Sequence, residues 1–333
     1  MTVGIDVAGT GFTVLDRLYA GEDRAGEALG GSCGNVLVSL AMLSRSVTPV
    51  LTLGRDWAGD YLVREFADAG ADTRYISRRA DVASPILAQR LNLESGHHWF
   101  SFICPETKAE LPRYTSIEAA DVSHAHDVIS RCSVFYSDRV SDTIVEAMES
   151  AAEAGALIYF EPSSIENDKL FERALKVSRI LKYSSDCLAD RISASDLSAN
   201  AISIVTHGAS GLELRQGDVR IWCEAMPATI VRDTCGSGDM VSVGVIDWIL
   251  DRSNLAAPDW TLTSLLGGVV AGQRLAAANC AFAGPRGLFQ RFGAAMARQV
   301  LDGAVVASLT QLTSSATSVE SVATQPPRGC VGL

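Results

Sequence analysis

The chain has 333 residues, of which 47% are apolar and 20% are charged, a composition typical of a globular protein with a large buried core. Its formal net charge of −11 disfavours nucleic acid as the main partner, because phosphate backbones are bound chiefly by clustered Lys and Arg. The first residues lack a basic segment followed by an apolar core, and no apolar window approaches the length of a membrane span, so we expect a cytoplasmic protein.

Short runs of strand type alternate with segments of helix type along the chain. We predict strands at 49–53, 133–137, 156–160, 179–183 and 201–206, and helices at 60–70 and 141–155. Such alternation is typical of βαβ units, so the predicted fold class is α/β with a mainly parallel central sheet flanked by helices. Ligands of such sheets usually bind where the strands end.

Two segments interrupt this alternation. Residues 12–29 and 84–104 have the pattern of short strands joined by turns, and the second contains a candidate hairpin around residues 94–96. A small flap over a site and an ordinary hairpin at a sheet edge are equally compatible with this pattern. From about residue 313 the chain is rich in Ser, Thr, Ala and Pro, so we expect a single domain at 1–312 and a flexible tail at 313–333.

The stretch RDTCGSGDM (232–240) places two glycines, a serine and a carboxylate in front of the apolar run MVSVGVIDWIL. We predict a strand at 227–231, then a turn at 233–239, and then a buried helix. The first backbone N–H groups of a helix lack internal acceptors, and glycines let an anion approach them closely. The turn is therefore suited to hold a phosphate or an oxyanion against the N–H groups of residues 236–239.

Asp239 is the residue that makes this turn unusual. A carboxylate in the first turn stabilises the N-terminus of any helix. Beside an anion-binding turn it can also accept the proton of a hydroxyl that attacks a phosphoryl group. The residues alone leave both roles open, and the combination favours phosphoryl transfer.

This turn resembles the C-terminal signature of the PfkB, or ribokinase-like, family of carbohydrate and nucleoside kinases. DTCGSGD (233–239) differs from the family's Asp-Thr-x-Gly-Ala-Gly-Asp only by Ser237 in place of Ala. GGSCGNVLVSLAML (30–43) is similar to the family's N-terminal pattern, and further similarity at 53–73 and 205–214 extends the resemblance over about residues 3–295. The resemblance implies a ribokinase-like three-layer fold, in which the segments 12–29 and 84–104 form a small β-sheet lid.

The resemblance also implies roles for individual residues, with ATP and Mg²⁺ as cofactors. For catalysis, it implies Asp239 as general base, with Gly236, Ser237 and Gly238 as anion hole. For substrate binding, it implies Asp16, Gly31 and Asn35. For binding of ATP, it implies Thr206, Gly208, Gly211 and Asn279. Carboxylate and amide groups are suited to hold vicinal hydroxyls through paired hydrogen bonds. Without the resemblance, Asp16 is equally compatible with a turn residue, and Asn35 with a helix N-cap.

The chain departs from the family pattern at two places that the family uses for magnesium and phosphate. The usual Asn-x-x-Glu is replaced by Ser184 and Cys187, with Asp186 one residue away. The usual Asp-x-Asn is replaced by Glu161 and Ser163. The ligands of Mg²⁺ are therefore not assigned, and Asp186 and Glu161 are the candidates.

We expect an ATP-dependent kinase that phosphorylates a hydroxyl group of a small sugar or sugar acid. A nucleoside kinase is the nearest alternative, because Phe12, Trp99 and Phe102 in the lid segments could sandwich a base, although packing within the lid or a contact between subunits is the simpler explanation. An exposed lid sheet also favours a homodimer through that sheet.

Two further classes of protein are weighed against the kinase. A non-catalytic sensor of nucleotides or sugars is compatible with the changes at Ser184 and Cys187, but the intact Asp239 argues against it. A nicotinamide dehydrogenase is disfavoured because GTGFTV (9–14) lacks the third glycine of a dinucleotide fingerprint. The chain also has no GxxxxGK[ST] motif, which excludes a Walker-type loop.

Overall fold

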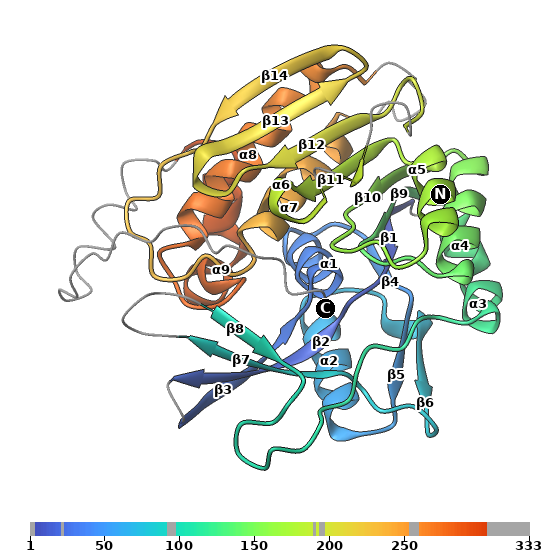
Figure 1. The fold of residues 1–333 in the computed structure, drawn as a ribbon, viewed down its shortest axis with the longest axis vertical. Coiled ribbons are helices and arrows are strands. Elements are labelled where there is room, and N and C mark those ends of the chain that lie inside the picture. Colours follow the sequence, from blue (N-terminus) through green and yellow to red (C-terminus); the bar gives the residue numbers. More distant parts are fainter. Residues whose placement is uncertain are drawn as a thin grey trace.

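The computed structural model describes residues 4–20, 23–91, 98–188, 191–192, 197–252 and 260–304. Most of these residues form a central sheet between two layers of helices, and a smaller sheet lies beside them (Figure 1). The central sheet has eight strands in the order β14-β13-β12-β11-β10-β9-β1-β4. Their bounds are β1 Ile5–Thr10, β4 Val47–Pro49, β9 Cys132–Ser137, β10 Leu157–Phe160, β11 Ile180–Ser184, β12 Ile202–Thr206, β13 Gly211–Gln216 and β14 Val219–Glu224. Neighbouring strands are parallel, except that β13 is antiparallel to both β12 and β14.

Helices cover both faces of this sheet because successive side chains of a strand point to opposite faces. One core lies under α1, α7, α8 and α9 and includes Tyr136 and Tyr159. The other lies under α3, α4 and α5 and includes Phe135 and Phe160. The helices span α1 Ser32–Met42, α2 Trp57–Asp68, α3 Ala119–Ile129, α4 Asp142–Glu153, α5 Asp168–Val177, α6 Ser185–Leu188, α7 Ser237–Asp251, α8 Leu262–Asn279 and α9 Gly287–Leu301. The predicted α/β class with a mainly parallel central sheet is confirmed.

The two segments that interrupt the alternation form one four-stranded sheet, in the order β3-β2-β7-β8. Residues 12–29 supply β2 (Val14–Ala20) and β3 (Asp23–Gly30), and residues 84–104 supply β7 (Ile86–Leu91) and β8 (His98–Ser101). The predicted small second sheet is thus present and is mixed, since β2 and β7 pair in parallel while β2–β3 and β7–β8 are antiparallel; its role as a lid stays a proposal. Trp99 on β8 is 57% exposed, and a dimer through this sheet stays a proposal. The tip of the predicted hairpin at 94–96 and the tail at 313–333 lie outside the described residues.

Two predicted strands need correction. The run at 49–53 is divided between β4 of the central sheet and β5 (Leu51–Gly54), which pairs with β6 (Ile76–Arg79) in a separate two-stranded sheet. The predicted strand at 227–231 is wrong, since these residues form an irregular connection. The hairpin β13–β14 already occupies that edge of the sheet, and the chain after 231 is instead tied to the end of α8, where the N–H groups of Arg232 and Asp233 donate to the carbonyl of Cys280 at 2.8 and 3.1 Å.

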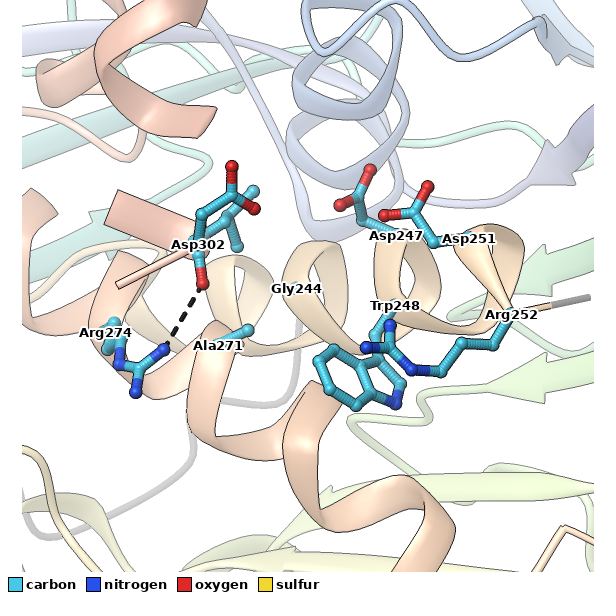
Figure 2. Close-up of a pocket in the computed structure, with 9 residues that line it drawn as sticks. Gly244, Asp247, Trp248, Asp251, Arg252, Ala271, Arg274 and Asp302 are labelled. Carbon is cyan, nitrogen blue, oxygen red and sulfur yellow. Dashed lines mark hydrogen bonds between the residues drawn. The ribbon is translucent and has the colours of Figure 1, made fainter. Parts of the chain in front are cut away.

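Helix α7 is tied to its neighbours near its C-terminal end. Asp247 accepts hydrogen bonds from Arg45 Nε (2.7 Å), just after α1, and from Arg298 Nη2 (2.9 Å) on α9. A cavity of about 240 Å³ lies beside this ion-pair group and is lined by Gly244, Asp247, Trp248, Asp251, Arg252, Ala271, Arg274, Leu301 and Asp302 (Figure 2). The cavity lies at the opposite end of α7 from the turn at 233–239.

No helix within the described ranges is long and apolar enough to cross a membrane.

Candidate active site

The turn before α7 has the backbone geometry that anion binding requires. Gly236 has a φ of 73°, in the left-handed region, and a Cβ at this position would lie 2.4 Å from the Cβ of Pro285, so the position requires glycine. Ser237 begins the helix, and its N–H and hydroxyl groups both donate to the carbonyl of Thr234, at 3.2 and 2.8 Å. The N–H groups of Gly238 and Asp239 lie in the first helical turn and have no acceptor within the helix, so they can donate to an anion, whereas the N–H of Met240 already donates to the carbonyl of Gly236 at 2.9 Å.

Asp239 is the third residue of α7 and lies beside these N–H groups. Its carboxylate is buried, and its Oδ2 accepts a hydrogen bond from Asn35 Nδ2 at 2.8 Å. Asn35 is buried in α1, far from Asp239 in the sequence. The structure thus joins the predicted base to one of the predicted substrate-binding residues.

Asp16 and Gly31 lie where the lid meets α1. Asp16 comes from β2, and its Oδ1 is buried without a hydrogen-bond partner in the structure, so it can accept a bond from a ligand hydroxyl. A Cβ at Gly30 would lie 1.8 Å from Asp16 Oδ2, so glycine makes room for this carboxylate. Gly31 has a φ of 81°, and a Cβ there would lie 2.2 Å from the carbonyl oxygen of Phe12. The two glycines therefore let the start of α1 approach the lid closely.

Arg286 joins this group although no sequence motif contains it. It directly precedes α9, and only 2% of its surface is exposed. Its Nη1 donates to Asn35 Oδ1 at 2.6 Å, and its Nη2 lies 3.6 Å from Glu65 Oε2 on α2. The guanidinium group thus contacts the opposite side of the Asn35 amide from Asp239.

Lys182 brings a positive charge to the other side of the turn. It lies in β11, and a Cβ at Gly238 would be 3.5 Å from its Nζ. The ammonium group forms a buried ion pair with Glu161, which directly follows β10. The Glu161 carboxylate also accepts hydrogen bonds from the hydroxyls of Tyr136 (3.0 Å) and Ser242.

The environment of Asp239 shifts its proton affinity. The pKa of Asp239 is raised to about 6, because burial and the Glu161 carboxylate raise it by more than the Asn35 hydrogen bond and the Lys182 charge lower it. At neutral pH most Asp239 side chains are therefore ionised. A carboxylate with a pKa near the working pH is a better general base than one with an ordinary pKa.

Asp16 is shifted in the same direction. The pKa of Asp16 is raised to about 7, because burial and, to a smaller extent, the negative charge of Asp239 raise it by more than the positive charge of Arg286 lowers it. The negative charge of Asp239 therefore disfavours the ionised form of Asp16.

Three of the four residues predicted to border ATP lie at or just after the end of β12. Thr206 is the last residue of this strand, and its hydroxyl is 3.4 Å from the carbonyl of Tyr183. Gly208 and Gly211 stand at the two sides of a single 3₁₀ turn (Gly208–Ser210) with φ values of 57° and 125°. These are conformations that favour glycine, and they place the turn at the carboxyl edge of the sheet.

Asn279, the fourth residue of this group, has a structural position. Its side chain is fully buried, and its Nδ2 donates to the carbonyls of Gly284 (3.2 Å) and Pro285 (3.1 Å). Its Oδ1 accepts from the N–H of Leu288 at 3.0 Å. The amide thus fixes the loop that carries Arg286. Its hydrogen bonds are made to the backbone of that loop and the start of α9.

The two magnesium candidates differ in their surroundings. Within the described ranges, no group of three or more His, Cys, Asp or Glu side chains is arranged to hold a metal ion. The Glu161 carboxylate is already engaged by Lys182, Tyr136 and Ser242, so it does not fit as a direct ligand. Asp186 is exposed in α6, directly after β11, and is compatible with a magnesium ion held mainly by phosphates and water.

Asp138 is a further acidic residue of this edge that the sequence reasoning missed. It directly follows β9, is buried, and accepts a hydrogen bond from the N–H of Phe12 at 2.8 Å. The guanidinium group of Arg139 lies 4.6 Å from the centre of the Phe12 ring. An acidic residue directly after a predicted strand, as at Glu161, was the signal that could have revealed Asp138.

The profile of the pfkB family carbohydrate kinases matches residues 22–258 of the chain. The chain belongs to this family. It is therefore a carbohydrate kinase, and both the enzyme class and the family that the signature turn implied are confirmed.

Three similar proteins illustrate the relationship. A fructokinase from Klebsiella pneumoniae is 28% identical over 78% of this chain and 91% of its own length. An aminoimidazole riboside kinase from Salmonella typhimurium is 26% identical over 68% of this chain and 74% of its own length. The crystal structure of a fructokinase with bound ATP from Xylella fastidiosa has a TM-score of 0.70, with 24% identity, over 93% of this chain and 99% of that chain. At this identity the solved structure shows a shared fold.

Proposed function

We propose that this kinase transfers the γ-phosphoryl group of ATP to a hydroxyl group of a small sugar or sugar acid. The observation that carries the proposal is the buried Asp239 at the start of α7, beside a glycine turn and hydrogen-bonded to Asn35. The similarity to a fructokinase, and to the fold of a fructokinase that binds ATP, supports the same assignment.

The chemistry of the site follows from these positions. Asp239 accepts the proton of the attacking hydroxyl, and the N–H groups of Gly238 and Asp239 stabilise the negative charge on the phosphoryl group in transfer. Phosphoryl transfer needs positioning and charge stabilisation more than covalent catalysis, so no protein nucleophile is required. Mg²⁺ bound through the phosphates would neutralise their charge, with Asp186 as its candidate protein ligand.

The substrate is held between the body and the lid. Asp16 on β2 and Asn35 on α1 are placed to hold neighbouring hydroxyl groups, so a bound sugar would link the lid to α1. Closing the lid over the sugar excludes water, which is a competing nucleophile for the phosphoryl group.

An acceptor panel tests the proposed function. ADP release from MgATP is measured with ketoses, aldoses, sugar acids and nucleosides, and the product of any responsive acceptor is identified by mass spectrometry. We expect one class of sugar or sugar acid to raise ADP release far above the rate without acceptor. ATP binding with no product from any acceptor would contradict the proposal and favour a sensor.

The pH profile of the reaction gives a separate check. Asp239 must be ionised to accept a proton, and its pKa is raised to about 6, so activity is lost as the pH falls through that value. We expect kcat/KM to fall about tenfold for each pH unit below about 6, and to stay nearly level from pH 7 to 8. A profile that stays flat down to pH 5, in protein whose unfolding temperature shows an intact fold, would count against Asp239 as the base.

A nucleoside kinase remains the second candidate, supported by the similarity to a riboside kinase. Two of the three aromatic residues that prompted it, Phe12 and Phe102, pack in a cluster of lid side chains with Val14 and Leu87, while Trp99 is exposed. These contacts favour packing within the lid. Phosphorylation confined to the nucleosides of the panel would reverse the order of the two candidates.

A further inference from the structure

Arg286 is a buried charged side chain whose hydrogen bonding is incomplete. Its Nη2 is buried without a hydrogen-bond partner in the structure and makes only a long ion pair of 3.6 Å with Glu65. Burying a charged group with an unsatisfied donor costs stability. This cost indicates that Arg286 has a role in the site. The hydrogen bond from its Nη1 to Asn35 indicates which role.

The contact between Arg286 and Asn35 has a direction. A guanidinium group can only donate hydrogen bonds, so the atom of the Asn35 amide that faces it is Oδ1, at 2.6 Å from Nη1. The Nδ2 group then faces Asp239 and donates to its Oδ2 at 2.8 Å. If the amide turned over, two donors would face each other on one side and two acceptors on the other. Arg286 therefore selects one of the two amide orientations.

We propose that Arg286 is a positioning residue, which holds the Asn35 amide in the orientation that donates a hydrogen bond to the general base. The proposal rests on the proposed function, because that function assigns Asp239 the role of base. Arg286 acts through Asn35, and Asn35 favours the ionised form of Asp239 that can accept a proton. Its loop is fixed from behind by the buried amide of Asn279.

Other charges also face Asp239 and must be separated from this effect. Glu161 follows β10, Lys182 lies in β11 and Asp16 comes from β2. The charge of Arg286 also acts on Asp239 directly through space. A test must therefore remove the Asn35 amide independently while these groups stay in place.

The titration of Asp239, followed by NMR of ¹³C-labelled aspartate carboxyls and assigned with Asp239→Asn, is a readout that needs no turnover. In Arg286→Met we expect its midpoint to rise by about one pH unit, because the amide is no longer oriented and a positive charge is lost. Arg286→Lys keeps a charge and a group that only donates, so it should restore at least half of this shift. Arg298→Met removes another arginine of α9, which pairs with Asp247, and should leave the midpoint unchanged.

A double-mutant cycle decides whether Arg286 acts through Asn35. In an Asn35→Ala background, Arg286→Met should move the midpoint by less than half as much as in the wild-type background, because no amide remains to be oriented. Equal shifts in the two backgrounds would overturn the proposal, since Arg286 would then act by its charge alone. Arg286→Lys carries the same cycle if the methionine variant is unfolded.

Kinetics separate this proposal from the proposed function. With the responsive acceptor, Arg286→Met should lower kcat about twofold at pH 7 and nearly tenfold at pH 5, where most Asp239 is protonated, and much less in the Asn35→Ala background. Absence of turnover by the wild-type protein would defeat the proposed function, while the NMR cycle would still support or overturn the positioning role.

Discussion

Replacing Asp239 with Asn is expected to lower kcat by roughly 10² to 10⁴-fold while the protein stays folded and still binds ATP. The amide has nearly the shape of the carboxylate, and its oxygen can still accept the hydrogen bond that Asn35 donates at 2.8 Å. The variant lacks only the ability to accept a proton at neutral pH. Steady-state rates with the responsive acceptor, together with calorimetric binding of ATP, measure the two effects.

A stability measurement distinguishes loss of the base from damage to the fold. The folded-state pKa of Asp239, about 6, is higher than its ordinary value of 3.8, so the folded protein binds the proton more tightly than the unfolded chain. The contribution of this group to stability is therefore greatest at low pH and is lost as the pH rises towards 6. Asn does not ionise, so Asp239→Asn removes the destabilisation that the buried, ionised carboxylate causes at high pH. The unfolding temperature of the variant at pH 8 should therefore equal or exceed that of the wild type. A lower unfolding temperature together with lost activity would show structural damage and not loss of a base.

Replacing Lys182 with Met is expected to destabilise the fold by about 3–5 kcal/mol, the usual cost of leaving one partner of a buried ion pair alone. The Lys182 and Glu161 side chains are only 4% and 11% exposed, so little water can take the place of the lost ammonium group. The hydroxyls of Tyr136 and Ser242 still donate to Glu161, but neither carries a charge. Chemical unfolding monitored by circular dichroism gives the free energy directly.

The matched control for this effect is the double variant Lys182→Met with Glu161→Gln. It removes both charges and keeps an acceptor for the Tyr136 and Ser242 hydroxyls, so we expect it to recover most of the lost stability. Glu161→Gln alone should destabilise, because it leaves the Lys182 ammonium group without its partner. A single Lys182→Met variant as stable as the wild type would show that the ion pair contributes nothing to the fold.

The central strands could be predicted from the sequence because they are mostly buried and appear as short runs rich in apolar residues. The runs at 133–137, 156–160, 179–183 and 201–206 correspond to β9, β10, β11 and β12. The run at 227–231 has the same composition but forms no strand. The hairpin β13–β14 occupies that edge of the sheet instead. Its strands mix polar and apolar residues, so the sequence gives little indication of them.

The candidate site was predictable only where a local motif marks it. The turn at 233–239 and the glycines before α1 are such motifs, and they led to Asp239 and Asn35. Arg286 and Lys182 have no motif, because their positions depend on burial and on partners from distant parts of the chain. Arg286, for example, contacts an amide 251 residues away in the sequence. A single sequence does not encode that proximity in any local pattern.

Helix α7 is linked to α1 near both of its ends, which limits how the two helices can move relative to each other. Its first turn is linked to α1 by the bond between Asp239 and Asn35, and its last turns are linked to the end of α1 by the ion pair between Asp247 and Arg45. A helix pair fastened at both ends can neither slide nor rotate without breaking a buried polar contact. These links hold Asp239, the proposed base, in place relative to α1, so we expect any opening and closing around a substrate to come from the small sheet β3-β2-β7-β8. Changes that widen the choice of acceptor should accordingly be sought in the lid, where they leave the base undisturbed.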